Sequence, residues 1–228
     1  MFFWHPAELL VIPAMILAIW AQFKVKASFS KYAKVGVASG MSGAKAARRI
    51  LDSQGLYDVP IEVSRGMLSD HYDPTTKVVR LSEEVYYGNS ISSVAVAAHE
   101  VGHAVQHDTS YVPLQLRHGI FPVVNIGSTL AMPMFILGMF MRTPFLMVLG
   151  IFAFTLAVLF QVVTLPVEYN ASSRALGMLG AQGVVSREEE GMAKKVLDAA
   201  ALTYLAATLV AVMELIKLVI MYTSSSDD

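Results

Sequence analysis

Four long apolar segments dominate the hydrophobic pattern of the chain. The first, Phe2–Phe23, has Glu8 as its sole formal charge. In a helix that rises about 1.5 Å per residue, a segment of this length spans a hydrocarbon core of about 30 Å. The pattern predicts four transmembrane helices, at 2–23, 119–140, 145–165 and about 201–222, and the second and third are close enough for a tight hairpin. Because the nearest lysines follow the first segment rather than precede it, we expect a membrane anchor and not a cleaved signal peptide.

A polar segment, 24–118, separates the first two spans and has the pattern of a small α+β unit. Ser42 precedes an amphipathic helix that ends near Gly55, and Pro60–Val63 alternates as a strand does. Asp73-Pro-Thr-Thr-Lys predicts a turn between strands at Leu68–Tyr72 and Val78–Leu81, and so a two- or three-stranded antiparallel hairpin. A helix is then expected from Ile91 to His107.

A second polar segment, 166–200, lies between the third and fourth spans. It begins where the third span is expected to end at Pro166, and it predicts a helix over 167–179 that is broken by Gly180 and Gly183. Ser186 and Glu189 have the spacing of a capping box, in which each residue accepts a hydrogen bond from the other's backbone. From there one long helix is expected to continue into the fourth span, followed by a short tail at 223–228.

The distribution of the 17 Lys and Arg residues predicts the topology. Eleven lie between the first and second spans and four between the third and fourth, whereas Arg142 lies alone at the hairpin tip and Lys217 lies inside the fourth span. By the positive-inside rule, both polar segments face the cytoplasm and both termini lie outside. We therefore expect a multi-pass membrane protein with both polar segments on the cytoplasmic side.

The amino-acid composition excludes several kinds of partner and metal ligand. The hydrophobic share is 55% and the charged share only 15%, against about 25% in soluble domains. A net charge of −1 gives no field to attract nucleic acid, so we expect no nucleic-acid partner. The chain has no cysteine, which excludes disulfides and thiolate ligands. Any metal must therefore bind to His, Asp or Glu.

The predicted helix at 91–107 carries His99, Glu100 and His103 in an HExxH pattern. Residues four apart share a helix face, so the two imidazoles can bind one zinc ion, while Glu100 is placed to take a proton from a water that the ion activates. The alternative is a chance match in which both histidines are hydrogen-bonded core residues. We favour zinc because a buried helix seldom holds two His and a Glu without use.

A catalytic zinc site usually has three protein ligands, and the acids of the second polar segment supply the third candidate. Glu168 directly follows the third span, and two membrane crossings return the chain to the side of His103. The alternative is an interfacial carboxylate near a helix N-terminus. Ser172, one turn after Glu168, and Asp198 are candidates to orient a ligand histidine; Asp198 could equally be a juxtamembrane charge. His107, farther along the first helix, is expected to be a polar end residue.

Four stretches carry a family resemblance: AAHEVGHAVQH, LPVEYNASSRAL, DHYDPTTKVVRLS and VLDAAALTYLAA. Together they resemble the bacterial membrane-embedded neutral zinc metallopeptidases of the YugP-like family and, more distantly, the HtpX and CAAX-prenyl protease group. The resemblance implies zinc bound by His99, His103 and Glu168, with Glu100 catalytic, in a zincin-like unit attached to four transmembrane helices. The HtpX group usually carries Asp four residues after its ligand Glu, where this chain has Ser172, so any role of that Asp does not transfer.

The expected activity is zinc-dependent endopeptidase cleavage without a covalent intermediate, acting on membrane or membrane-associated proteins at the cytosolic face. An oxyanion or substrate contact is expected from His71, Arg174 or Tyr204, which spacing does not separate, and the strand Val78–Leu81 is a candidate edge for an extended substrate. The bilayer is an expected partner, and an adaptor or a second copy is left open. The rival hypotheses are a zinc-stabilised membrane scaffold or assembly factor without activity, and a metal transporter.

Overall fold

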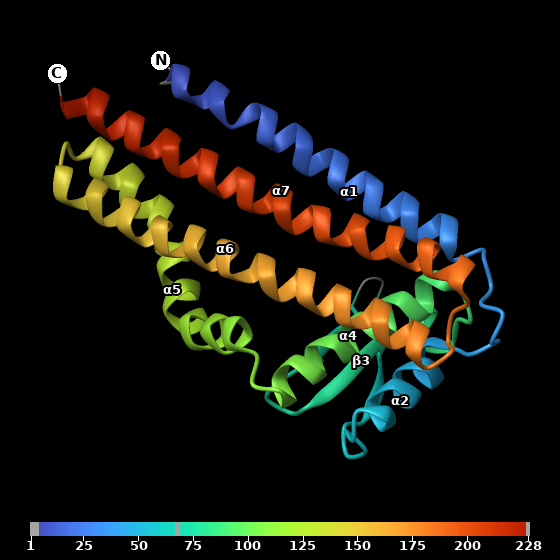
Figure 1. The fold of residues 1–228 in the computed structure, drawn as a ribbon. Helices are drawn as coiled ribbons and strands as arrows, with labels where there is room; N and C mark the ends of the chain where they lie inside the picture. Colours follow the sequence, from blue (N-terminus) through green and yellow to red (C-terminus); the bar gives the residue numbers. More distant parts are fainter. Residues whose placement is uncertain (1–4, 67–68, 227–228) are drawn as a thin grey trace. The chain divides into compact units, whose positions relative to one another are not determined.

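The computed structural model describes residues 5–66 and 69–226, which are mostly helical with one small sheet (Figure 1). Its elements are η1 (Pro6–Leu10), α1 (Ile12–Tyr32), α2 (Gly43–Ser53), β1 (Ile61–Ser64), β2 (His71–Asp73), β3 (Val78–Ser82), α3 (Glu83–Tyr87), α4 (Ile91–Asp108), α5 (Val112–Phe140), α6 (Pro144–Ala181) and α7 (Arg187–Ser226). The start of the first predicted span at residues 2–4, Leu68 of the predicted hairpin, and the last two residues of the tail lie outside the described residues.

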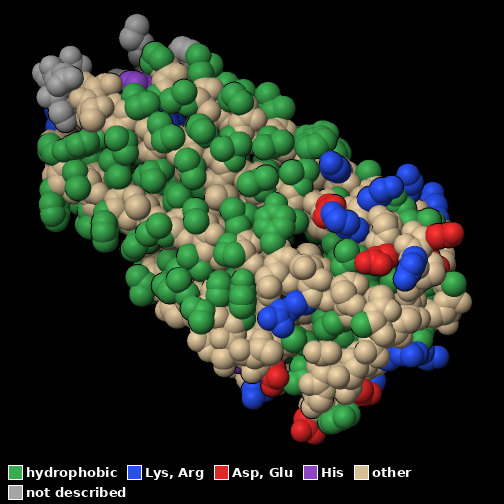
Figure 2. Space-filling view, in the orientation of Figure 1, with side chains coloured by type: hydrophobic (Ala, Val, Ile, Leu, Met, Phe, Trp, Pro, Cys, Tyr) green, Lys and Arg blue, Asp and Glu red, His purple; other side chains and the backbone are tan. Residues whose placement is uncertain are grey.

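Contacts divide the chain into two units. The apolar unit contains Met1–Ala21, Gln115–Pro166 and Thr203–Asp228, and the polar unit contains Gln22–Leu114 and Val167–Leu202. Four helical segments of the described chain are long and apolar enough to cross a membrane: Pro6–Tyr32, Val112–Phe140, Pro144–Ala181 and Arg187–Ser224. On the face drawn in Figure 2, hydrophobic side chains cover the apolar unit, and the charged side chains gather over the polar unit.

Close helix contacts and one ion cluster hold the apolar unit together. A Cβ at Gly150 of α6 would lie 2.7 Å from the backbone oxygen of Ala131 on α5, so only glycine permits this approach. Lys217 on α7 pairs with Glu214 on the same helix, as the spacing of these two residues suggests, and its Nζ also lies 3.5 Å from Oε2 of Glu8 in η1. The first and last membrane-length segments are therefore linked by a pair of opposite charges.

The sheet of the polar unit has the order β1-β3-β2. β2 and β3 pair antiparallel around the predicted turn, in which Asp73 Oδ1 accepts from the backbone N–H of Thr75 at 2.9 Å. The predicted antiparallel hairpin therefore forms with two strands, whereas the third strand, β1, pairs with β3 in parallel. Because β3 is the central strand, it is not the free edge that we expected for a substrate; β1 and β2 form the edges.

Local sequence signals place the helices of the polar unit. The Ser90 hydroxyl accepts from the Ser93 backbone N–H at 3.1 Å and begins α4, whose inward face packs on α2 and the sheet. The predicted capping box forms at the start of α7: the Ser186 N–H donates to Glu189 Oε2 at 2.7 Å, and the Glu189 N–H donates to Ser186 Oγ at 3.3 Å.

The third predicted span and the helix predicted over 167–179 form one continuous helix, because α6 runs through Pro166 from Pro144 to Ala181. Proline lacks one backbone N–H donor. In apolar surroundings no water is available to the neighbouring backbone groups, so they keep their hydrogen bonds within the helix and the helix continues. The division between the two units falls between Pro166 and Val167, in the middle of this continuous helix.

Candidate metal centre

Two helices of the polar unit bring three metal-ligating side chains together. His99 and His103, one turn apart on α4, face Glu168 on α6, and a ligand atom from each of the three lies within 4.8 Å of the other two. Glu168 Oε2 is 3.2 Å from His99 Nε2 and 3.5 Å from His103 Nε2. Among the described residues, this is the one group of three or more His, Asp or Glu side chains with that geometry.

Gly102 permits the close approach of the two helices. A Cβ at this position would lie 2.7 Å from the backbone oxygen of Ala171 on α6, a separation that real Cβ atoms do not show. Glycine in a helix interior lowers stability by about 1 kcal/mol relative to alanine. Here the lack of a side chain lets α4 lie against the turn of α6 that follows Glu168. Packing against α6 therefore accounts for a glycine at this position.

Burial and charge shape the electrostatics of the three side chains. The Glu168 side chain is 3% exposed, and those of His99 and His103 are 13% and 12% exposed. Burial alone would lower the pKa of His103, but the hydrogen bond that His103 donates to Glu168 and the charge of Glu100 outweigh burial and raise this pKa above its ordinary value. The site thus has a strong affinity for positive charge, which a proton or a metal cation can satisfy.

A chain of hydrogen bonds fixes which nitrogen of His103 faces Glu168. Arg174 Nε donates to Asn170 Oδ1 at 2.8 Å, and that oxygen also accepts from Gln106 Nε2 at 3.0 Å. A second bond from Gln106 Nε2, to the Val167 backbone oxygen at 2.8 Å, leaves its Oε1 to face His103 Nδ1 at 3.0 Å. Because an amide oxygen only accepts, Nδ1 carries a proton, and Nε2 is the nitrogen that remains to bind either a second proton or a metal cation.

Ser172 has the corresponding position beside His99. Its Oγ lies 3.1 Å from His99 Nδ1, while His99 Nε2 faces Glu168. A hydroxyl can accept from Nδ1–H and hold the ring with Nε2 directed at a metal. The departure from the Asp of the HtpX group therefore leaves a hydrogen-bonding side chain in contact with the ligand histidine.

Glu100 is next to a ligand without belonging to the three-residue group. Its side chain is buried, and its charge acts on His103. The structure gives His107 a separate partner, because its Nδ1 lies 2.9 Å from the Tyr72 hydroxyl of β2. Burial of Tyr72 raises the pKa of its phenol to about 12, so this group stays protonated at neutral pH.

The other residues that the sequence suggested for the site have different surroundings. Arg174 belongs to the hydrogen-bonded chain behind His103 and lies 5.9 Å from the centre of the Tyr111 ring. His71 is exposed on β2, with Nδ1 2.7 Å from the Ser69 backbone oxygen. Asp198 forms an ion pair with Lys194 at 2.6 Å, so its predicted pairing with a ligand histidine receives no support. Tyr204 lies on α7 in the apolar unit.

Sequence reasoning missed Gln106 and Asn170. Gln106 has no exposed surface, and a buried amide must find partners for its oxygen and its two N–H groups. The available signal was its position three residues after His103 on a helix, within reach of the imidazole.

Comparison with known proteins identifies the family of the chain. Residues 7–223 match the family described as "Putative neutral zinc metallopeptidase". A protein of Bacillus subtilis (strain 168), described as "Putative membrane protease YugP", is 56% identical over 219 residues, which cover 96% of this chain and 97% of that protein. No solved structure matches the chain. The chain belongs to the family of that description and is homologous to that Bacillus subtilis protein.

The residues present fit zinc, the metal of this family. Two imidazole nitrogens and one carboxylate oxygen are a donor set of catalytic zinc sites, which keep a further position for water or substrate. The two Nδ1 partners leave both Nε2 atoms directed at Glu168, the orientation that a shared cation requires.

Proposed function

We propose that this chain is a membrane-bound zinc endopeptidase that hydrolyses peptide bonds of membrane or membrane-associated proteins at the cytoplasmic face. The observation that carries the proposal is the convergence of His99, His103 and Glu168 in the polar unit, beside the buried Glu100. Family membership supplies the reaction class, and four membrane-length helices support a membrane location for the substrate.

In the proposed reaction, each side chain has one task. Bound zinc supplies Lewis acidity, which lowers the pKa of a water to about 7 and polarises the scissile carbonyl. His99, His103 and Glu168 hold the ion. The Glu100 carboxylate takes a proton from the attacking water and delivers it to the leaving amine nitrogen. Because water is the nucleophile, no covalent enzyme intermediate forms. Ser172 and Gln106 keep the two imidazoles in the orientation that binding needs.

A non-catalytic scaffold with structural zinc is the main competing function. Structural zinc sites usually have four protein ligands, whereas the group in the described residues has three. This difference supports the enzyme. A transporter would need metal ligands within the membrane helices, and the metal-ligating group of the described residues lies in the polar unit instead.

The Glu100→Gln variant tests the proposal. In detergent and in proteoliposomes, zinc content should equal that of the wild type, because Glu100 is not a ligand, while cleavage of casein and of a single-span reporter protein should fall by a factor of at least about 10². His99→Ala is the matched control on the same turn and should lose both zinc and cleavage. Unchanged cleavage by Glu100→Gln would exclude Glu100 as the general base.

A further inference from the structure

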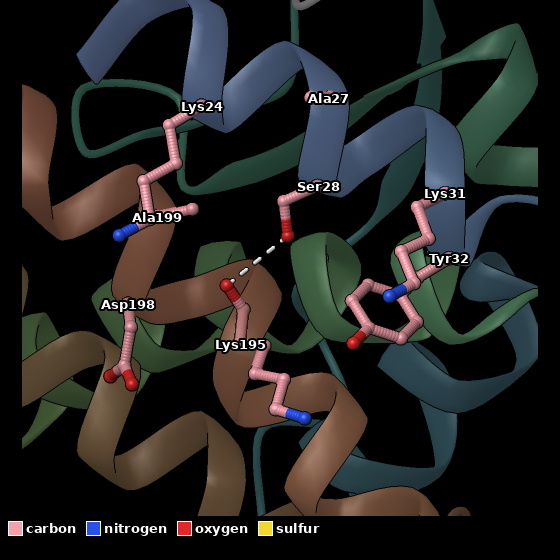
Figure 3. Close-up of a pocket in the computed structure, with 8 residues that line it drawn as sticks. All are labelled: Lys24, Ala27, Ser28, Lys31, Tyr32, Lys195, Asp198 and Ala199. Carbon is pink, nitrogen blue, oxygen red and sulfur yellow. Dashed lines mark hydrogen bonds between the residues drawn. The ribbon is translucent and has the colours of Figure 1, made fainter. Parts of the chain in front are cut away.

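A groove in the polar unit lies between the end of α1 and the start of α7 (Figure 3). It has a volume of about 390 Å³ and is lined by Lys24, Ala27, Ser28, Lys31, Tyr32, Lys195, Asp198 and Ala199. The Ser28 hydroxyl donates to the Lys195 backbone oxygen at 3.2 Å and ties the two helices together at the groove. The groove contains none of the candidate metal ligands, so it is a separate feature of the polar unit.

The charge of the groove is positive. Three of its lining residues are lysines, and its one carboxylate, Asp198, is already paired with Lys194 at 2.6 Å. Lys31 Nζ lies 5.3 Å from the centre of the Tyr32 ring, and Lys24 extends from α1 toward α7 in Figure 3. Ala27 and Ala199 give the same groove an apolar part. A ligand that suits both features carries a negative group attached to an apolar body.

Both helices change from apolar to polar at the level of the groove. On α1, Lys24 directly follows the apolar segment 2–23; on α7, Asp198 and Ala199 directly precede the apolar segment 201–222. In a bilayer, this boundary lies at the level of the lipid phosphates. A soluble anion has no reason to favour that level, whereas a phospholipid places its phosphate there.

We propose that this groove binds the headgroup of an anionic phospholipid, with Lys24, Lys31 and Lys195 around the phosphate and Ala27 and Ala199 against the glycerol and the start of an acyl chain. An anionic lipid is preferred over a zwitterionic one because the choline cation of the latter would meet the same lysines. The site would hold one lipid beside the polar unit and so fix the depth of that unit at the membrane surface. This proposal does not depend on the peptidase activity.

Tryptophan fluorescence can test the proposal, because the chain has two Trp residues and Trp20 lies one turn before Lys24 on α1. In a Trp4→Phe background, Trp20 is the sole reporter, and it is half exposed. The protein is reconstituted in phosphatidylcholine vesicles that contain a minor fraction of either brominated phosphatidylglycerol or brominated phosphatidylcholine. We expect stronger quenching by the brominated phosphatidylglycerol. Equal quenching by the two brominated lipids would overturn the proposal.

Paired charge variants separate a specific site from general attraction to an anionic surface. Lys31→Gln/Lys195→Gln should weaken the preference for phosphatidylglycerol by about 30-fold, the size expected when two lysines no longer attract an anionic lipid. Lys26→Gln/Lys34→Gln, which removes the same charge outside the groove, should change it far less. Equal losses in the two variants would overturn the proposal. Inorganic phosphate at millimolar concentration is also added to the protein without these substitutions. If it made the quenching by the two brominated lipids equal, the groove would be a site for free phosphate and the proposal would be overturned.

Discussion

At the scale of single residues, the candidate site depends on an amide that binds no metal. Gln106 contacts both helices that carry the ligands, because its side chain joins His103 on α4 to Val167 and Asn170 on α6. An arginine can only donate, so Arg174 at the far end of the chain fixes the direction of every bond up to His103. Arg174 therefore determines, through three hydrogen bonds, that Nδ1 of His103 carries a proton.

Substitutions along this chain should weaken zinc binding in a graded order. Gln106→Leu removes the acceptor of His103 Nδ1–H, and we expect a 10- to 100-fold loss of zinc affinity, the usual cost of removing such a partner. Asn170→Ala should cost less, and Arg174→Met, which keeps the aliphatic stem, should cost least. Chelator competition measures the affinities, and thermal unfolding is followed in parallel.

The Arg174→Met variant distinguishes orientation from charge. If Arg174 acted on the site only through its positive charge, its removal would strengthen the binding of a cation. Stronger zinc binding by Arg174→Met would therefore contradict the orienting role. A loss of thermal stability in Gln106→Leu with unchanged zinc affinity would likewise reduce Gln106 to a packing residue.

At the scale of elements, the separation of α4 and α6 determines whether the three ligand atoms can meet. Gly102→Ala places a Cβ within 2.7 Å of the Ala171 backbone oxygen, so one helix must move. We expect zinc affinity to fall at least about tenfold and stability to fall by about 1–3 kcal/mol, as for other overpacked sites. Zinc titration and thermal unfolding measure the two effects.

Gly177→Ala is the matched control for that substitution. Gly177 lies in α6, and no atom lies within 4 Å of a Cβ built on it. The gain in helix propensity should raise stability by as much as about 1 kcal/mol and leave zinc binding unchanged. Wild-type zinc affinity in Gly102→Ala would show that the close approach of the helices is not needed.

Sequence periodicity predicted the elements well where each signal was local. The helix start after Ser42, the capping box at Ser186 and the turn after Asp73 each depend on residues within a few positions, and all three form. The parallel pairing of β1 with β3 is decided by packing between distant residues, and a strand pattern does not encode its direction. Pro166 ends one unit without interrupting α6, because the effect of proline on a helix depends on the surroundings.

The candidate site could be predicted only as far as helix spacing reaches. His99 and His103 share a face at four residues apart, and the fixed spacing carries that information. Glu168 needed an argument from membrane topology, since it lies 65 positions after His103. The spacing of Gln106 from His103 indicates one contact at most, because its other partners, Val167 and Asn170, come from another helix.

At the scale of the whole molecule, the proposed cytoplasmic site depends on an even number of crossings between α4 and Glu168. The chain has no cysteine, so each introduced cysteine is the one thiol of this protein that a membrane-impermeant maleimide can label in intact cells. Arg142→Cys, at the tip between α5 and α6, should be labelled from outside, because a lone arginine there does not outweigh the basic residues of the polar segments.

Two further single cysteines complete that test. Lys77→Cys, in the turn between β2 and β3, and Glu188→Cys, near the start of α7, should both be labelled only after the membrane is made permeable. Since His103 and Glu168 lie in the same polar unit as these positions, labelling of 77 and 188 from opposite sides is incompatible with one metal centre. Labelling of both from outside would keep the metal centre intact but move the proposed peptide cleavage to the external face, and with it the class of substrates that the enzyme can reach.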